Sequence, residues 1–334
     1  MPNSATAEPI TAIDRNGWNS SGPATRKRRP YRVVVHGLRH FCEKLPGLLG
    51  GEMWDVRDRS QHTPLQMMFL TRDLYSCDLV FCWAGRIDMG RFLWAVRAAR
   101  RSRVVIFWCG SDVLRAQRIR AKRPVDPWIA RQIHWAASPV LADEVRALGL
   151  PCEFVQASFV ESVRDPKPLP KKFSVLVFLP RADVAELYGW DRVVQVAKAL
   201  PHIHFKLAGL HDGQVVQAPD NVSVCHWTPD PRRLYEEATV LWRSVRHDAG
   251  ISFMVLEAMS HGRHVLYTYA VPGATQVSGI DDAREHLECL LALHQAGALS
   301  LNRAGIDVVA RTYSRDVVKD ELHRRWEEII CSPR

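Results

Sequence analysis

Short apolar strands alternate with amphipathic helices from residue 31 onwards, and this alternation stops once and then begins again. The first strand, Tyr31–Gly37, is apolar and ends in glycine before an expected helix over 39–49. The interruption is the proline- and lysine-rich stretch 165–172, which has the composition of a linker. Because strand–helix alternation folds into a parallel sheet covered by helices, two such runs predict an α/β protein with two Rossmann-like domains.

The remaining elements follow the same rhythm. In the first half we expect strands at 78–83, 104–108 and 133–137 and helices near 63–75, 88–101 and 139–148. In the second half we expect strands at 173–178, 204–208, 222–226 and 264–269 and helices at 190–200 and 231–238, before two mostly helical segments at 281–297 and 302–331. Dehydrogenases and periplasmic-type binding proteins share this rhythm, so the function has to be read from motifs.

Length and composition agree with two domains. A chain of 334 residues with 47% hydrophobic content is too long for one ordinary core. Residues 1–30 are rich in Ser, Pro, Ala and Thr and lack apolar periodicity, which is typical of a disordered tail. We therefore expect an N-terminal domain over 31–165, a C-terminal domain over 166–310 and a final helix over 311–334 that can pack back toward the N-terminal domain.

The cysteines and the hydropathy pattern favour a cytoplasmic protein. The 8 cysteines form no Cys-x-x-Cys pair, and several lie in or beside apolar strands, as buried reduced thiols do. No segment approaches the roughly 18 consecutive apolar residues of a membrane span, and the N-terminus lacks an apolar signal core. The 14 histidines are scattered without Cys/His or Asp/Glu clusters, so we expect no metal site.

The formal net charge of +9 is concentrated in residues 1–150, and the rest of the chain is close to neutral. Three basic clusters carry this excess: Arg26–Arg29, Arg91–Arg103 and Arg115–Arg123. A solvated basic face is the ordinary explanation. Contact with anionic membrane lipid is an alternative, because Phe92, Leu93 and Trp94 interleave with arginines as they do in interfacial helices. No recognisable motif supports nucleic-acid binding.

Residues 243–269 place a polar turn, a short helix and a strand in immediate succession, with Gly262 ending the helix. The helix N-terminus opens at Gly250, Ile251 and Ser252. Unpaired backbone N–H groups and the positive end of the helix dipole attract an anion at such a place, so it suits a ligand phosphate. Glu257 lies on the same helix, and its carboxylate suits the hydroxyl groups of a bound sugar.

The run Leu256-Glu-Ala-Met-Ser-His-Gly262, preceded by Gly250, resembles the nucleotide-binding core of the retaining glycosyltransferases of family 4. The family pattern is Glu-Gly-Phe-Gly-x-x-x-Leu-Glu-Ala-Met-Ala-x-Gly. The resemblance covers about 173–270, and elsewhere only the strand–helix rhythm is similar. It implies the GT-B fold, in which an acceptor-side domain and a nucleotide-sugar-binding domain face each other across a cleft.

The same resemblance implies a set of donor-binding residues. Glu257 would hold the ribose, and the Gly37 loop, Arg181 and the helix start at Gly250, Ile251 and Ser252 would hold the diphosphate. Gly209 corresponds to a glycine at a strand end, and Trp227 ends the strand that contacts the nucleotide base.

Two positions depart from the family pattern. Ala249 stands at the first acidic position, with Asp248 one residue earlier, and Tyr188 stands where the family has a lysine on the diphosphate. Arg263 and either Arg243 or Arg246 are candidates to replace that lysine, although each is also explained as a surface arginine.

His247 and Asp248 are the residues expected to face the donor sugar. No side-chain nucleophile is evident, so the family mechanism would apply, in which the departing phosphate helps to deprotonate the acceptor. An inverting reaction would need a general base, and Asp112, on the loop after the strand at 104–108, is the one candidate. Asp112 is explained equally well as a helix cap.

The resemblance implies a metal-independent, retaining transfer from a nucleotide-diphosphate sugar to a hydroxyl of a glycan, a lipid-linked sugar or a small molecule. The donor is a substrate, and no further cofactor is expected. An epimerase-type enzyme and a non-catalytic sugar-nucleotide-binding protein of the same fold are the alternatives. A nicotinamide enzyme is disfavoured because no Gly-x-Gly-x-x-Gly follows the first strand.

Overall fold

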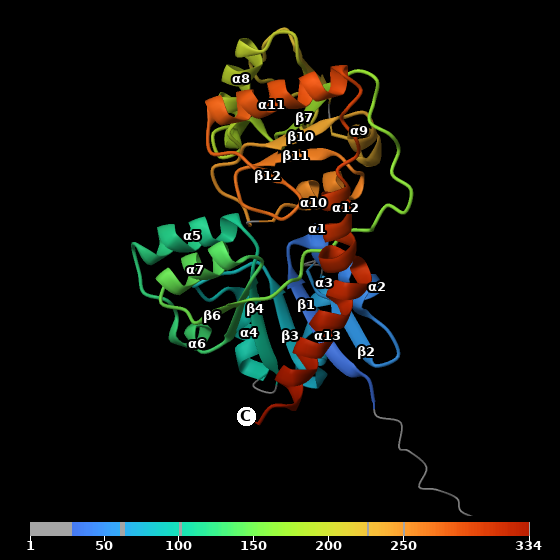
Figure 1. The fold of residues 1–334 in the computed structure, drawn as a ribbon. Helices are drawn as coiled ribbons and strands as arrows, with labels where there is room; N and C mark the ends of the chain where they lie inside the picture. Colours follow the sequence, from blue (N-terminus) through green and yellow to red (C-terminus); the bar gives the residue numbers. More distant parts are fainter. Residues whose placement is uncertain (1–28, 61–63, 100–101, 226, 250, 334) are drawn as a thin grey trace, which may run out of the picture.

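The computed structural model describes residues 29–60, 64–99, 102–225, 227–249 and 251–333. Gly250 of the expected anion site and the predicted tail up to residue 28 lie outside these ranges. The chain forms two lobes, each built on one six-stranded sheet flanked by helices, and Figure 1 shows one lobe above the other. Within the described ranges, no helix combines the length and the apolar character needed to cross a membrane.

The first sheet is parallel, with the strand order β2-β1-β3-β4-β5-β6. Its strands are β1 (Tyr31–Gly37), β2 (Trp54–Asp58), β3 (Leu79–Trp83), β4 (Arg103–Trp108), β5 (Ile133–Ala136) and β6 (Cys152–Phe154). The helices between them are α1 (Arg39–Cys42), α2 (Leu45–Leu49), α3 (Pro64–Ser76), α4 (Arg91–Ala99), α5 (Ser111–Arg120), α6 (Pro127–Ala130) and α7 (Pro139–Ala147). The predicted strands of the first half are confirmed, and β2 and β6 join them as the two edges.

The second sheet is also parallel and has the order β12-β11-β10-β7-β8-β9. Its strands are β7 (Ser174–Phe178), β8 (His204–Ala208), β9 (Val222–Cys225), β10 (Val240–Arg243), β11 (His264–Tyr267) and β12 (Thr275–Gln276). The accompanying helices are η1 (Ala182–Val184), α8 (Trp190–Ala199), α9 (Arg232–Glu236), α10 (Phe253–Ser260), α11 (Ile280–Gln295) and α12 (Arg303–Val308). The four strands expected here are confirmed, although β11 ends two residues earlier than its pattern indicates.

Each sheet has its own apolar core. All five side chains of β3 are buried, since this strand lies inside the first sheet with helices on its two faces. In the second lobe, Val255, Leu256, Ala258 and Met259 pack one side of α10 against the sheet. The arrangement leaves Glu257 on the side of α10 that is turned away from this core.

The chain crosses between the lobes twice, and the two crossings touch. The backbone N–H of Val160 donates a hydrogen bond to the carbonyl of Tyr313 at 2.9 Å, and Val160 also pairs with Ser314 in an isolated bridge. Beyond this point α13 (Arg315–Cys331) runs back along the first lobe (Figure 1). Its residues Val318, Leu322 and Trp326 are buried in the first core.

The mostly helical segment expected at 302–331 contains a break. The structure divides it into α12, a π-helical turn η2 (Val309–Tyr313) and α13, with an extended Ser314 between the last two. The break has a clear cause: α12 and η2 pack on the second core, whereas α13 packs on the first, so the chain must change direction at Ser314.

The interfacial interpretation of α4 is wrong for two of its three apolar residues. Phe92 and Leu93 are buried in the first core, because they face the sheet that α4 covers. Trp94 is 55% exposed, with the Arg97 guanidinium 5.2 Å from the centre of its ring. Helix α4 therefore exposes one aromatic ring to solvent instead of an apolar face that could lie on a membrane.

Candidate active site

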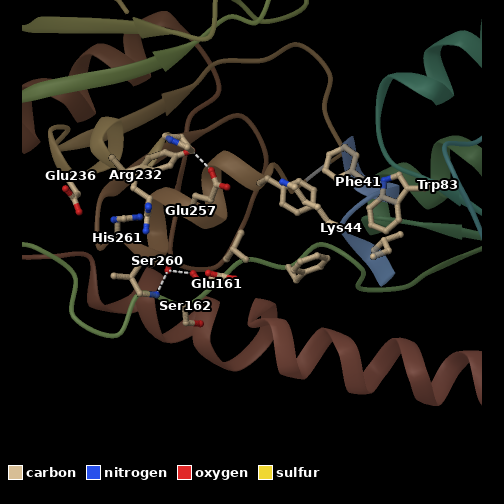
Figure 2. Close-up of a pocket in the computed structure, with 17 residues that line it drawn as sticks. Phe41, Lys44, Trp83, Glu161, Ser162, Arg232, Glu236, Glu257, Ser260 and His261 are labelled. Atoms are coloured by element: carbon tan, nitrogen blue, oxygen red, sulfur yellow. Dashed lines mark hydrogen bonds between the residues drawn. The ribbon is translucent and has the colours of Figure 1, made fainter. Parts of the chain in front are cut away.

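A cavity of about 670 Å³ lies between the two lobes. Its first-lobe wall consists of Phe41, Lys44 and Leu45 near α1 and α2 together with Trp83 at the end of β3. The crossing segment 159–163 forms a second wall, and α9 and α10 form the rest (Figure 2). Pockets of about 300–1,000 Å³ suit small organic ligands, so this cavity has room for a nucleotide.

Glu257 projects from α10 into this cavity, opposite Lys44 and Phe41 (Figure 2). One of its carboxylate oxygens, Oε2, accepts a short hydrogen bond from the Tyr235 hydroxyl. Burial raises the pKa of Glu257 above its ordinary value, while the Tyr235 hydrogen bond and the charge of Lys44 act in the opposite direction. The carboxylate is thus fixed in direction and faces a cationic group across the cavity.

Tyr235 lines the cavity and is not identified by the sequence pattern. It lies on α9, is 2% exposed, and its ring stacks on His261 with 5.4 Å between the ring centres. Burial and the neighbouring Glu257 charge raise the pKa of Tyr235, so the phenol stays protonated and remains a donor. In the sequence, Tyr235 is one more apolar position of a short helix, and nothing local indicates that its hydroxyl meets Glu257.

The N-terminus of α10 has no side-chain cap. Ser252 is the N-cap residue, and its side chain makes no capping hydrogen bond. Ile251 and Ser252 are both 8% exposed, so the turn before the helix lies close to the protein interior. N–H groups in the first turn of a helix lack intrahelical partners, and an anion can take that place.

Asp248 is enclosed by partners from its own lobe. Its carboxylate accepts hydrogen bonds from Arg243 at 3.0 and 3.2 Å and from the Tyr267 hydroxyl at 3.2 Å. The Arg243 guanidinium is itself buried and lies 4.8 Å from the centre of the Tyr188 ring. Arg243 therefore lies next to Tyr188, the position at which the resemblance implied a lysine.

His247 joins the two lobes. Its Nε2 lies 2.9 Å from Oε2 of Glu144, which belongs to α7 of the first lobe. Close by, Gly110 of the first lobe faces Ala249, and an added Cβ on Gly110 would lie 3.5 Å from the Ala249 nitrogen. The residues expected to face the donor sugar thus lie where the lobes meet.

Asp112 serves the backbone of the first lobe. Its carboxylate accepts hydrogen bonds from the N–H groups of Gly85 at 2.6 Å, Cys109 at 3.1 Å and Val113 at 3.1 Å. Burial raises the pKa of Asp112, and these backbone donors act against that rise. Asp112 lies in the first turn of α5, and the N-cap is Gly110, so the helix-cap assignment is displaced by two residues.

The other expected residues within the described ranges do not line the large cavity. Gly37 needs to be glycine, because its φ is +145° and an added Cβ would lie 1.8 Å from the Trp83 carbonyl oxygen. Arg181 is exposed and pairs with Asp183 at 2.9 Å. Gly209 packs against the Phe178 ring, and Trp227 is 58% exposed just beyond β9.

Arg263 has a different position from the one expected. It is fully buried, and its guanidinium donates hydrogen bonds to the carbonyls of Lys167 at 2.6 Å and Pro168 at 3.1 Å. These contacts attach the proline-rich linker to the second lobe. Among the expected residues that the structure describes, Glu257 is the one that lines the large cavity.

No family model matches the chain, and no curated protein matches its sequence. Solved structures do match its fold. A glycosyltransferase from Rickettsia africae ESF-5 has a TM-score of 0.66 at 9% sequence identity, over 92% of this chain and 100% of that one. HepE from Anabaena, solved in complex with UDP-glucose, has a TM-score of 0.64 at 10% identity, over 89% and 99%.

TarM from S. aureus, solved in a complex that includes UDP, has a TM-score of 0.57 at 11% identity. That match covers 80% of this chain, which spans 59% of the TarM chain. Identities this low establish a shared fold and leave the activity to be argued from the site. The chain has the GT-B glycosyltransferase fold, with two Rossmann-like domains facing each other across a cleft.

Proposed function

We propose that this protein is a glycosyltransferase that moves a sugar from a nucleotide-diphosphate sugar to a hydroxyl acceptor. The observation that carries the proposal is Glu257, whose carboxylate faces an interdomain cavity of about 670 Å³ and is held in place by Tyr235. A fixed, partly buried carboxylate is suited to accept hydrogen bonds from two neighbouring hydroxyl groups, as on a ribose. The solved structures of this fold that contain UDP or UDP-glucose support a nucleotide sugar as donor.

The diphosphate would lie beyond the ribose, at the N-terminus of α10, where the Ser252 side chain makes no capping hydrogen bond. Arg181 is the exposed cation in the donor set that the resemblance implies. Its ion pair with Asp183 is solvent-exposed, with side-chain exposures of 54% and 67%, and such pairs contribute at most about 1 kcal/mol. Arg181 can therefore leave Asp183 for a phosphate at little cost.

The proposed reaction retains the anomeric configuration and requires no bound metal. The bond between the sugar C1 and the phosphate oxygen breaks, and the acceptor oxygen bonds to C1 on the same face. The acceptor proton passes to the departing phosphate. Arg181 and the α10 N-terminus would stabilise the negative charge that develops on the leaving group, which is the main way a protein assists such a step.

Thermal unfolding with a panel of nucleotides tests the donor site, because a ligand that binds the native state raises the melting temperature. We expect a selective shift with one nucleotide among UDP, GDP, ADP and CMP and their common sugars, unaffected by EDTA. The nucleotide sugar identified in this way should then be consumed when hydroxyl acceptors are added. No shift with any nucleotide would contradict the proposal.

A non-catalytic sugar-nucleotide-binding protein is the second candidate, and one observation favours it. Ala249 replaces the first acidic residue of the motif, and the neighbouring Asp248 is engaged by Arg243 and Tyr267. Such a protein would bind the nucleotide sugar without transfer or hydrolysis even at high protein concentration. Conversion of the donor in the absence of any acceptor would indicate an epimerase-type enzyme instead.

We further propose that the protein is cytoplasmic and that its contact with the membrane is electrostatic. The exposed residues Arg115, Arg118, Arg120 and Lys122 form a basic surface on and just after α5, whereas α4 offers Trp94 as its exposed large apolar side chain. Binding to vesicles with anionic lipid should then disappear as ionic strength rises. Binding that persists in high salt would contradict an electrostatic contact.

A further inference from the structure

A second, smaller cavity of about 130 Å³ lies in the first lobe, at the carboxyl ends of β1, β3 and β4. Gly37 lines this cavity and pairs in the β1–β3 register with Trp83, which lines the large cavity. Ligands of open α/β sheets bind beyond the carboxyl ends of the strands, so the cavity is in a place where a substrate group can bind. Its volume suits a small group rather than a nucleotide.

The wall of this cavity is held rigidly in an unusual conformation. Ala84 has a φ of 137°, the only positive value at a non-glycine residue in the described part of the chain. At the next position an added Cβ on Gly85 would lie 1.9 Å from the Trp108 ring, and the Gly85 N–H is fixed by the Asp112 carboxylate at 2.6 Å. Backbone strain of this kind persists only where the surroundings enforce it, and it concentrates at ligand sites.

The charge of the lining is one-sided. Its titratable side chains, apart from the Cys82 thiol, are His36, Arg86 and Arg115, and no carboxylate of the described residues lines it. His36 is immobilised, because its ring stacks on Phe92 at 3.6 Å and its Nδ1 lies 2.7 Å from the Arg59 carbonyl. The remaining lining side chains include Leu93 and Ile106, so the base of the cavity is apolar.

The two arginines differ in whether their charge is already paired with a carboxylate. Arg86 forms an ion pair with Asp88 at 3.0 Å. Arg115 makes no hydrogen bond or ion pair with any residue that the structure describes, and it lies on α5 at the cavity edge. An unpaired guanidinium that lines the same cavity as a second arginine is suited to a phosphoryl group, whose oxygens accept paired N–H bonds.

We infer that this cavity binds a phosphoryl group carried by the acceptor, with Arg115 as its principal contact. The inference rests on the proposed function, because it assigns the acceptor of that same transfer to phosphorylated compounds. The phosphoryl group anchors the acceptor in the first lobe, and the acceptor hydroxyl then extends past Gly37 toward the donor sugar. A soluble sugar or polyol phosphate and the head group of a phospholipid both carry such a phosphoryl group.

The test compares the Arg115→Gln variant with the Arg118→Gln variant. Both changes remove one exposed arginine from α5, but Arg118 does not line the cavity. Glycerol 3-phosphate is titrated into each protein at saturating nucleotide, with glycerol as the uncharged control, and binding is followed by the melting temperature. We expect Arg115→Gln to weaken glycerol 3-phosphate binding at least about tenfold and Arg118→Gln to leave it unchanged.

The nucleotide titration separates this inference from the proposed function. An unchanged nucleotide shift in all three proteins, with glycerol 3-phosphate binding lost in Arg115→Gln alone, supports a soluble phosphorylated acceptor. Binding to phosphatidic acid vesicles that is lost in Arg115→Gln alone, without a response to glycerol 3-phosphate, supports a lipid head group. The inference would be overturned if the two variants bound the probes equally, or if the wild type bound neither probe. The proposed function would be overturned if the wild type showed no nucleotide shift.

Discussion

Glu257 combines a cost in stability with a gain in binding. Burial raises its pKa in the folded protein, so the unfolded chain releases the proton more readily. The penalty is absent below the unfolded pKa and is fully present above the folded pKa. We therefore expect Glu257→Gln to keep or raise the melting temperature and to weaken nucleotide binding at least about tenfold, measured by titration of both proteins. Unchanged affinity would place Glu257 outside the donor site.

Tyr235→Phe tests whether the hydroxyl positions Glu257. The ring and its packing on His261 stay, and the lost hydrogen bond costs about 1 kcal/mol of stability. Because the Tyr235 hydrogen bond lowers the pKa of Glu257, its removal should shift the pH profile of nucleotide binding to higher pH. The measurement is nucleotide affinity from pH 4 to 8. A loss of stability with an unshifted pH profile would make Tyr235 a packing residue only.

At the scale of elements, β5 holds a histidine that should make the first lobe sensitive to acid. His134 is 2% exposed; its Nδ1 accepts from Trp108 Nε1 at 3.1 Å, and its Nε2 lies 2.9 Å from the Ile129 carbonyl. Burial lowers the pKa of His134 from 6.5 to about 4. The unfolded chain therefore binds this proton first, so stability is intact above pH 6.5 and declines as pH falls toward 4.

The shift corresponds to about 3 kcal/mol of lost stability at pH 4. Urea unfolding at pH 7 and pH 4.5 should show most of this decline in the wild type and a smaller one in His134→Gln. The glutamine variant will be less stable at pH 7, because it loses the Trp108 hydrogen bond, so the comparison is between the slopes with pH. Equal slopes would show that His134 does not carry the acid sensitivity.

The elements that the sequence predicts best are those whose surroundings are uniform. β3 is apolar throughout because it is buried on both faces, whereas β2 is an edge strand in which Asp55 and Arg57 form an ion pair, and its pattern is mixed. The α10 helix and Glu257 follow from a local motif. The Tyr235 contact and the first-lobe wall of the cavity join residues distant in sequence, and no local pattern encodes them.

The whole molecule depends on how the two lobes meet. Two chain crossings touch at Val160 and Tyr313, and the Phe41 ring of the first lobe stacks on Phe253 of α10 with 5.2 Å between the ring centres. The contact between Glu144 and His247 joins α7 of the first lobe to the loop before α10 in the second lobe. Contacts of this kind allow the lobes to separate, because each contact contributes only about 1 kcal/mol.

Glu144→Ala should therefore favour the open form of the unliganded protein, since it removes the partner of His247. The neighbouring Asp143→Ala is the matched control, because its carboxylate also lies on α7 but is 74% exposed and pairs with Arg146 within the helix. A loss of about 1 kcal/mol changes the open-to-closed ratio about fivefold. Small-angle X-ray scattering should then give a larger radius of gyration for Glu144→Ala than for Asp143→Ala or the wild type, and a saturating nucleotide should reduce the difference. If the two variants scatter alike, the Glu144–His247 contact does not hold the lobes together, and the aromatic stack of Phe41 on Phe253 becomes the next contact to remove.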